Sequence, residues 1–140
     1  MHGIAPVTED LTFHHVGVAC TDIAAEVHRL QCLGYAREGG EFVDPIQGVR
    51  GIFLGGQQPR LEILEPLDGR SGVLSSWLRA GTKLYHLAYE VDRLERAIAF
   101  MRQSRAKLLV PPTPAVAFQG RHIAFLILPN QLLVEFIART

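Results

Sequence analysis

The stretch FHHVGVACTDI at residues 13–23 returns as LYHLAYEVDRL at residues 84–94, so that His86 repeats His15. A second pair of segments, RLEIL at 60–64 and LVEFI at 133–137, aligns Glu62 with Glu135 in the same way. Two copies of a small unit related by a pseudo-twofold axis would bring two imidazoles and two carboxylates to one place. The repeat therefore predicts a divalent metal site with the ligands His15, Glu62, His86 and Glu135.

Taken singly, a histidine in a strand is usually a packed or an exposed side chain. The two glutamates each lie between apolar neighbours, Leu61 with Ile63 and Val134 with Phe136, which predicts burial. A buried carboxylate without a partner is costly, and a metal ion is an efficient partner. Imidazole and carboxylate ligands suit zinc, cobalt, nickel, iron or manganese. Four ligands on an ion that accepts six leave room for substrate oxygens or water, which is typical of a catalytic site.

Hydrophobic periodicity predicts the order βαβββ twice. The first copy has a strand at 12–20, a helix from about 21 to 33 and strands near 35–38, 51–54 and 60–65. Thr21 or Asp22 is expected to cap this helix, and Gly34 to end it. In the second copy an Asp92-x-x-Glu95 start opens a helix that fades near 104, and strands follow near 107–110, 123–128 and 131–137. Turns are expected at 55–56 and 129–130.

These elements predict one α+β domain over residues 1–140. Module one covers about 12–68, a linker helix about 71–80, which Gly81 closes, and module two about 83–138. Residues 1–10 show no periodicity and are expected to form a loose arm. Only Cys20 and Cys32 are present, without a CxxC spacing, and both are expected to be buried thiols.

The charge balance indicates which classes of partner the protein does not attract. Lysine and arginine number 14, as do aspartate and glutamate, so nothing draws the chain to nucleic acid or to an anionic membrane. A small-molecule substrate is the expected partner. The absence of an apolar run of about 18 residues, and of a signal-like start, predicts a cytoplasmic protein.

The segment FQGRH at 118–122 could contact a substrate, because a glycine loop followed by two donors can hold a carboxylate or a phosphate. Arg121 could equally be a solvated surface charge. The loops 38–50 and 111–121 are expected to line the pocket, and no functional role is predicted for His2 or His28. His14 is expected to pack against the first helix. The candidate substrate-binding residues are Gln47, Phe118, Gln119, Arg121 and His122.

Four segments, HVGVA at 15–19, LEILEPL at 61–67, YHLAYEVD at 85–92 and LLVEFI at 132–137, resemble the vicinal oxygen chelate superfamily, also called the glyoxalase and bleomycin-resistance fold. The resemblance covers residues 13–138 and is closest to methylmalonyl-CoA epimerase-like proteins. It implies a curved, partly closed mixed sheet around the metal with the helices outside, and it maps the family's ligands onto the same four residues. A homodimer is also expected.

In that family the metal holds two substrate oxygens while a carboxylate removes a proton next to a carbonyl. We therefore expect a metal-dependent isomerase or epimerase, with an acyl thioester as a possible substrate. Glu135 is the first candidate for the base and Glu62 the second. The loop DPIQGV at 44–49 has Ile46 where such epimerases carry an acidic residue, and Gly51 replaces a second glutamate, so that Glu41 or Asp44 would have to reach the site instead.

Two other functions remain open at this point. Lyases of the glyoxalase I type, the lactoylglutathione lyases, resemble this chain in all four ligands, but they carry an arginine and an asparagine where this chain has Ala19 and Pro66. A non-catalytic small-molecule binder of the same fold is the second alternative. Such a binder does not need the four ligands, so their presence favours catalysis.

Overall fold

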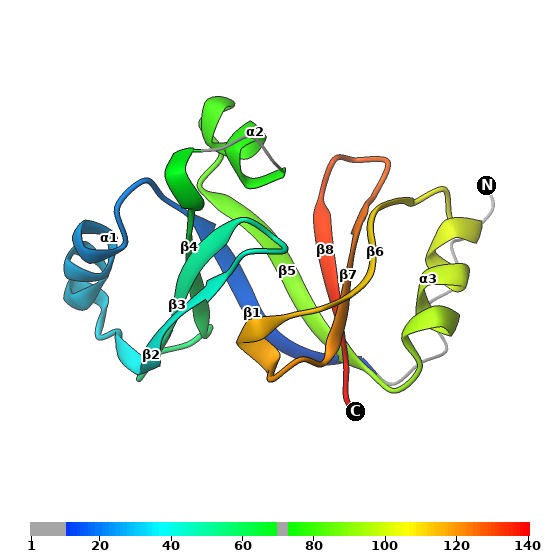
Figure 1. Ribbon diagram of the computed structural model, residues 1–140, viewed down its shortest axis with the longest axis horizontal. Helices are drawn as coiled ribbons and strands as arrows, with labels where there is room; N and C mark the ends of the chain where they lie inside the picture. The colour runs from blue at the N-terminus through cyan, green and yellow to red at the C-terminus, as the bar shows by residue number, and fades with distance from the viewer. Residues whose placement is uncertain (1–10, 70–72) are drawn as a thin grey trace. The chain divides into compact units, whose positions relative to one another are not determined.

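The computed structural model describes residues 11–69 and 73–140 (Figure 1). The predictions for residues 1–10, and for the first turn of the linker helix at 71–72, lie outside the described residues. The predicted order βαβββ occurs twice and is confirmed. The elements are β1 (Thr12–Ala19), α1 (Ile23–Leu30), β2 (Ala36–Asp44), β3 (Val49–Gly55), β4 (Leu61–Pro66), α2 (Val73–Arg79), β5 (Leu84–Val91), α3 (Leu94–Gln103), β6 (Lys107–Pro114), β7 (His122–Ile127) and β8 (Leu133–Ala138).

The strands form one mixed sheet in the order β2-β3-β4-β1-β5-β8-β7-β6. The pairs β1·β4 and β5·β8 are parallel, and each module adds two antiparallel pairs. The order begins at β2 and ends at β6 without returning, so the sheet is not closed. The α+β class is confirmed, and no helix of the described residues is long and apolar enough to cross a bilayer.

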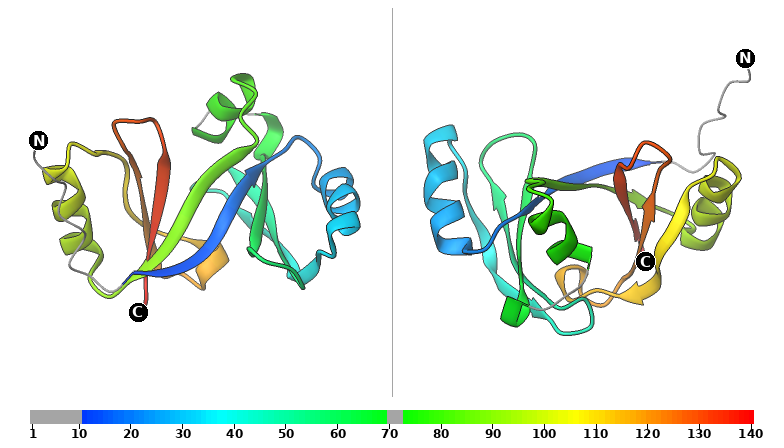
Figure 2. Two further views of the ribbon diagram at one scale, coloured as in Figure 1. Left: turned by 180° about the vertical axis from the view of Figure 1, so that it is seen from behind. Right: turned by 90° about the horizontal axis from the view of Figure 1, so that it is seen from above.

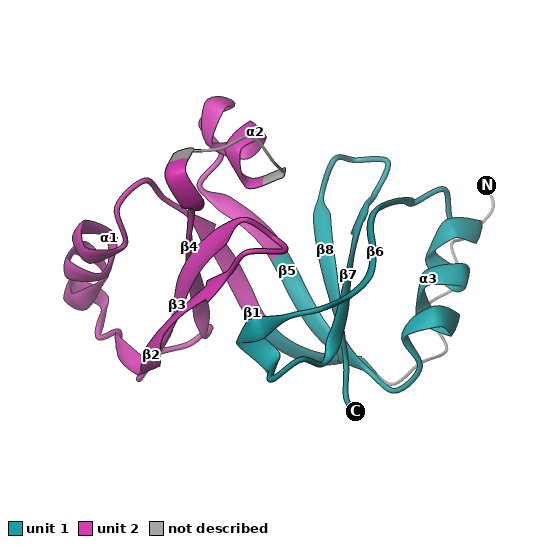
Figure 3. Cartoon of the chain, viewed as in Figure 1, with its two compact units in different colours: residues 1–14, 87–140 teal, residues 15–86 magenta. Residues whose placement is uncertain are grey.

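The chain divides into two compact units, drawn in different colours in Figure 3. We call residues 15–86 the N-unit, and residues 11–14 together with 87–140 the C-unit. The boundary falls inside β5, after His86. Within the N-unit, Ala19 N of β1 donates to Lys83 O, just before β5, at 2.8 Å.

Helix α1 and the strands β3 and β4 enclose the core of the N-unit. Asp22 caps α1 as predicted, since its Oδ1 accepts from Ala25 N at 3.2 Å, and Gly34 ends the helical segment at a φ of +94°. Glu65 Oε2 accepts from Ile23 N, 2.9 Å away, and so holds the start of α1 against β4. The buried core residues are Val18, Cys20, Ile23, Val27, Tyr35, Ile52, Leu54, Leu61 and Ile63.

Helix α3 packs in the same way on β6, β7 and β8 in the C-unit (Figure 2). The buried core residues are Val91, Leu94, Ala97, Ile98, Ala106, Ala124, Leu126, Val134, Phe136 and Ala138. The predicted cap at Asp92 is wrong. Arg93 occupies the cap position without a side-chain hydrogen bond, and Asp92 Oδ1 accepts from Arg139 at 2.6 Å. A charged guanidinium donor competes well with a backbone amide for this carboxylate.

The two cysteines differ in environment. Cys20 is buried as expected, and burial raises the pKa of its thiol to about 11. Cys32 is exposed, so the prediction that it is buried is wrong. It lies in a short 3₁₀ turn, Gln31–Leu33, after the apolar stripe of α1 has ended, and therefore does not face the core.

Candidate metal centre

Three of the four predicted ligands meet inside the N-unit. His15 Nε2 lies 3.0 Å from His86 Nε2 and 3.0 Å from Glu62 Oε1. His86 Nε2 lies 3.4 Å from the same carboxylate oxygen. The exposed fractions of His15, Glu62 and His86 are 0%, 4% and 2%, so the three side chains are removed from water. Two nitrogens and one oxygen therefore converge on one buried point.

Strand alternation explains this convergence. The core under α1 contains Val18 of β1 and Leu61 and Ile63 of β4. Their immediate neighbours along each strand, Gly17 and Glu62, therefore face the opposite side of the sheet. Strands β1 and β4 run parallel with Gly17 opposite Glu62. His15 precedes Gly17 by one alternation and therefore shares its face, which places the imidazole and the carboxylate next to each other.

Gly17 makes room for the third side chain. A Cβ atom at this position would overlap the ring of His86. The missing side chain lets the imidazole of His86 lie directly over the backbone of β1. The sequence alone does not predict this role. The repeat nevertheless contains a signal for it, since the second copy also has a small residue, Ala88, at the equivalent position.

Substituting Gly17 by alanine should therefore disturb the cluster. Displacing His86 is an overpacking change, so Gly17→Ala is expected to lower the free energy of unfolding by about 1 to 3 kcal/mol. Its affinity for a divalent ion should fall together with its stability. Denaturant titration and metal titration measure the two effects. Gly40→Ala is the matched control, because a Cβ there meets nothing within 4 Å. Unchanged stability and affinity in Gly17→Ala would show that His86 does not need this space.

The electrostatics of the cluster fit a cation. Burial raises the pKa of Glu62, but the charges and hydrogen bonds of His15 and His86 outweigh burial and hold the pKa below its usual value. Glu62 is thus a carboxylate whose oxygen both imidazole nitrogens face. When the two imidazoles are deprotonated, their nitrogens and the carboxylate oxygen form a donor set that suits divalent transition ions, and the residues present therefore fit such an ion.

Aromatic rings continue the cluster on both sides. His15 meets Phe53 edge-on at 5.3 Å between ring centroids, and Phe53 meets Phe42 at 6.0 Å. On the other side His86 meets Tyr85 at 4.9 Å, and Tyr85 meets Trp77 of α2 at 5.9 Å. These contacts restrict how each imidazole ring can turn. They also bring the only tryptophan of the chain within two ring contacts of a candidate ligand.

Glu135 occupies the equivalent place in the C-unit. Its neighbours Val134 and Phe136 face the core under α3, so Glu135 faces the opposite side of the sheet, and it is 2% exposed. Strands β5 and β8 run parallel with Ala88 opposite Glu135, which repeats the pairing of Gly17 with Glu62. In each module the glutamate therefore lies opposite the residue that follows the histidine by two positions.

The loop between β2 and β3 is held together by its own hydrogen bonds. Asp44 is 1% exposed, and its carboxylate accepts from Ile46 N and Gln47 N at 3.1 Å each and from Gln47 Nε2 at 3.0 Å. Gln47 is therefore a partner of Asp44 in this structure. Glu41, the alternative to Asp44 as an acidic residue near the site, is exposed and pairs with Arg37 at 3.5 Å.

The remaining candidate substrate residues lie around the turn before β7. Phe118 is 3% exposed, whereas Gln119 and His122 are exposed. Arg121 Nη1 donates to Glu90 Oε2 at 2.9 Å and to Ala138 O at 3.2 Å. The hydrogen bond from Arg121 holds the pKa of Glu90 below its usual value. Arg121 therefore ties this turn to β5 and β8, and its charge is already compensated.

His14 also lies in this region. Its ring meets Phe118 edge-on at 5.4 Å between centroids. His14 therefore contacts the turn before β7.

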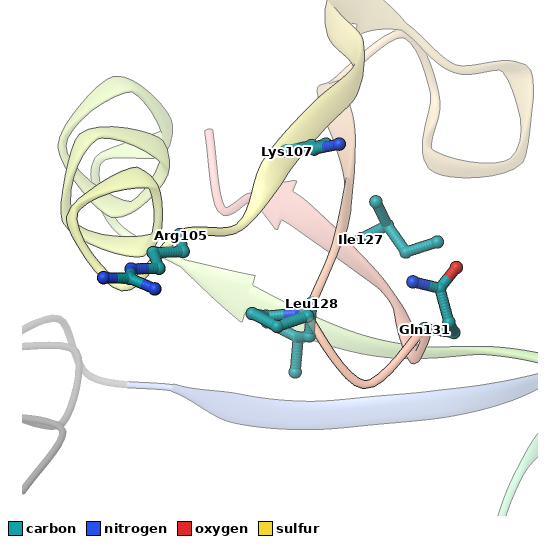
Figure 4. Close-up of a pocket in the computed structure, with 6 residues that line it drawn as sticks. Arg105, Lys107, Ile127, Leu128 and Gln131 are labelled. Carbon is teal, nitrogen blue, oxygen red and sulfur yellow. The ribbon is translucent and has the colours of Figure 1, made fainter.

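A separate hollow of about 280 Å³ lies at the end of the β6·β7 pair (Figure 4). Arg105, Lys107, Ile127, Leu128, Pro129 and Gln131 line it. The side chains of Arg105 and Lys107 extend in different directions in Figure 4. They do not form a clamp for one anion, so this hollow is not a candidate active site.

Comparison with known proteins agrees with the fold. The family model of the glyoxalase/bleomycin resistance protein/dioxygenase superfamily matches residues 14–125. An ethylmalonyl-CoA/methylmalonyl-CoA epimerase of Cereibacter sphaeroides is 25% identical over 81% of this chain and 85% of its own. A mitochondrial methylmalonyl-CoA epimerase of Dictyostelium discoideum is 22% identical over 81% of this chain and 68% of its own.

A solved structure of Streptomyces coelicolor methylmalonyl-CoA epimerase, in complex with 2-nitronate-propionyl-CoA, superposes with a TM-score of 0.76. The sequence identity is 25%, and the match covers 94% of this chain and all of that one. The family match spans most of the chain, including three of the four predicted ligands. The chain therefore belongs to the glyoxalase/bleomycin resistance protein/dioxygenase superfamily.

Proposed function

We propose that this protein is a metal-dependent epimerase that removes the proton next to the carbonyl of an acyl thioester. His15, Glu62, His86 and Glu135 hold one divalent ion, which is zinc, cobalt, nickel, manganese or iron. The observation that carries this function is the convergence of two imidazole nitrogens and a carboxylate oxygen in the N-unit. The equivalent strand register supports Glu135 as the fourth ligand.

The relatives support the choice of substrate class. Two proteins that align over 81% of this chain are named as epimerases of methylmalonyl-CoA. The solved Streptomyces coelicolor epimerase carries an acyl-CoA analogue. A thioester of a substituted malonate is therefore the first substrate to test.

The chemistry follows from the charge that develops. Removing a carbon-bound proton next to a thioester places negative charge on the carbonyl oxygen, and stabilising that charge lowers the barrier. The bound ion supplies this stabilisation as a Lewis acid. Glu135 would accept the proton at its carboxylate and later release it to solvent. A proton delivered from solvent to the opposite face of the same carbon would give the epimer, so that one proton leaves the carbon and one returns to it. No oxidant or reductant is needed.

Glu135 is the first candidate for the base, because Glu62 Oε1 already faces both imidazoles at 3.0 and 3.4 Å. The loop residues are weaker candidates. Asp44 accepts three hydrogen bonds within its own turn, and Glu41 pairs with Arg37. The protein is therefore assigned a single base. One base is sufficient to exchange the proton with solvent, so exchange should be detectable even where net epimerisation is slow.

The glyoxalase I alternative can be tested by rate. Ala19 and Pro66 provide no polar side chain where lyases of that type have an arginine and an asparagine. Each lost contact to a substrate typically costs about 1 to 3 kcal/mol, so turnover of the glutathione hemithioacetal of methylglyoxal should be at least about a hundredfold below that of such a lyase. The absorbance of the thioester product reports the rate. A rate in the ordinary enzyme range would make the lyase the leading function.

A further inference from the structure

We infer that Phe42 and Phe53 form an apolar wall, called the aromatic wall below, that receives the alkyl substituent on the reacting carbon of the substrate. The aromatic wall then sets the size of substituent that the protein accepts. This inference rests on the proposed function and adds a specificity-determining element to it. All the residues that carry it belong to the N-unit.

Phe53 is adjacent to the candidate ligands. It lies directly opposite Glu62 in the antiparallel pair β3·β4, so both side chains project from the same face of the sheet. Its ring meets the ring of His15 edge-on, at 5.3 Å and an interplanar angle of 76°. Phe53 is only half-buried, in contrast to the 0% exposure of His15. The aromatic wall therefore begins next to the buried donor atoms and extends toward solvent.

A β-bulge brings Phe42 to the same place. Glu38 pairs with Phe53 and Phe42 pairs with Gly51, so the stretch between them is longer in β2 than in β3. Gly39 lies within that stretch at a φ of +74°, a conformation that favours glycine. Bulges commonly redirect a side chain beside a functional site. Here the bulge places Phe42 opposite Gly51, and the centroid of its ring lies 6.0 Å from that of Phe53.

Gly51 provides the space that Phe42 occupies. A Cβ at this position would lie 2.5 Å from Phe42 Cζ and 2.7 Å from Leu64 Cδ2. The ring of Phe42 therefore covers a bare stretch of backbone on the face that carries Glu62. The position of the Phe42 ring depends on both the glycine at 51 and the bulge in β2. A side chain at position 51, or a regular β2 without the bulge, would move the ring.

The chemistry of this surface selects an apolar occupant. Its base consists of Gly51 and Leu64, and Leu64 is 4% exposed. Asp44, a carboxylate on the neighbouring strand, accepts hydrogen bonds within its own turn and offers no donor to a second carboxylate. A substrate carboxylate placed against the two rings would lose water without gaining a donor, which is unfavourable. A short alkyl group loses no hydrogen bonds with water there, and it gains van der Waals contact with the two rings.

The test compares 2-methyl-, 2-ethyl- and 2-propylmalonyl thioesters as substrates. Proton exchange at the substituted carbon is followed in deuterated water, and kcat/KM is measured for each compound. One methylene in an apolar pocket changes selectivity by about 10- to 200-fold. Phe42→Ala should therefore shift the propyl-to-methyl ratio by at least about tenfold toward propyl, with Phe42→Leu in between. Gly51→Ala should shift the ratio toward methyl, and the double variant should recover the larger substituents.

Val43→Ala is the matched control, because Val43 is exposed, neighbours Phe42 on β2 and alternates to the other face. It should leave the ratio unchanged. Metal content is measured for every variant, so that a shift in the ratio cannot come from metal loss. An unchanged ratio in metal-loaded Phe42→Ala and Phe42→Leu, with exchange intact, overturns the aromatic wall while the proposed function stands.

Binding of the same three compounds, measured by calorimetry, separates the two claims. If no compound exchanges but Phe42→Ala still shifts the propyl-to-methyl affinity ratio by about tenfold, the proposed function fails and the aromatic wall remains. If the affinity ratio is also unchanged, the aromatic wall is rejected as well.

Discussion

Removing one candidate ligand should abolish the tight binding of one divalent ion per chain. His86→Ala deletes one of the two imidazole nitrogens that meet at 3.0 Å, and Glu135→Ala deletes the carboxylate assigned as the fourth ligand. Losing an outer partner of a ligand already costs about 10- to 100-fold in metal affinity. Losing the ligand itself should therefore cost more than about a hundredfold. Elemental analysis of loaded and desalted protein measures the stoichiometry.

Trp77 offers a second readout of the same binding. It is the only tryptophan of the chain, and it reaches His86 through one intervening ring, that of Tyr85. Cobalt or nickel at the cluster should quench its fluorescence, and His86→Ala should remove the quenching. His28→Ala is the control, because this histidine is exposed on α1. Wild-type protein that binds no stoichiometric ion would contradict the four-ligand assignment.

Replacing Glu135 by glutamine should stop proton exchange without emptying the metal site. The amide keeps an oxygen that can face the ion, but it cannot accept a proton as a carboxylate does. General-base catalysis contributes about 10²- to 10⁴-fold, so the exchange rate should fall by at least about a hundredfold. Deuterium incorporation into the thioester measures this rate, with metal content determined on the same sample.

Glu62→Gln provides the comparison for this substitution. If metal-loaded Glu135→Gln exchanges at the full rate, Glu135 is not the base and Glu62 becomes the next candidate. If both variants lose exchange while both retain metal, the two carboxylates act together.

The sequence predicted those parts of the structure that rest on repetition and alternation. The double βαβββ order, the cap at Asp22 and the end of the helical segment at Gly34 follow from local patterns, and the structure confirms them. The equivalence of Glu62 and Glu135 appears in the structure as an identical strand register. Strand periodicity carries such information because it decides which face every residue takes.

Features that depend on tertiary partners were not predictable in this way. Asp92 has the spacing of a helix cap, but Arg139 from the far end of the chain takes its carboxylate. Gly17 and Gly51 look like ordinary strand glycines, and only the rings of His86 and Phe42 show why a side chain is excluded there. The bulge that places Phe42 gives no periodic signal, because it interrupts the period.

Deuterium exchange on a 2-methylmalonyl thioester tests the central claim most directly. We expect that metal-loaded protein replaces the proton on the substituted carbon with deuterium, that a chelator stops the exchange, and that adding the ion back restores it. His86→Ala should show no exchange under the same conditions. Protein that carries one ion per chain and binds the thioester, yet leaves this proton unexchanged, would contradict the proposed function.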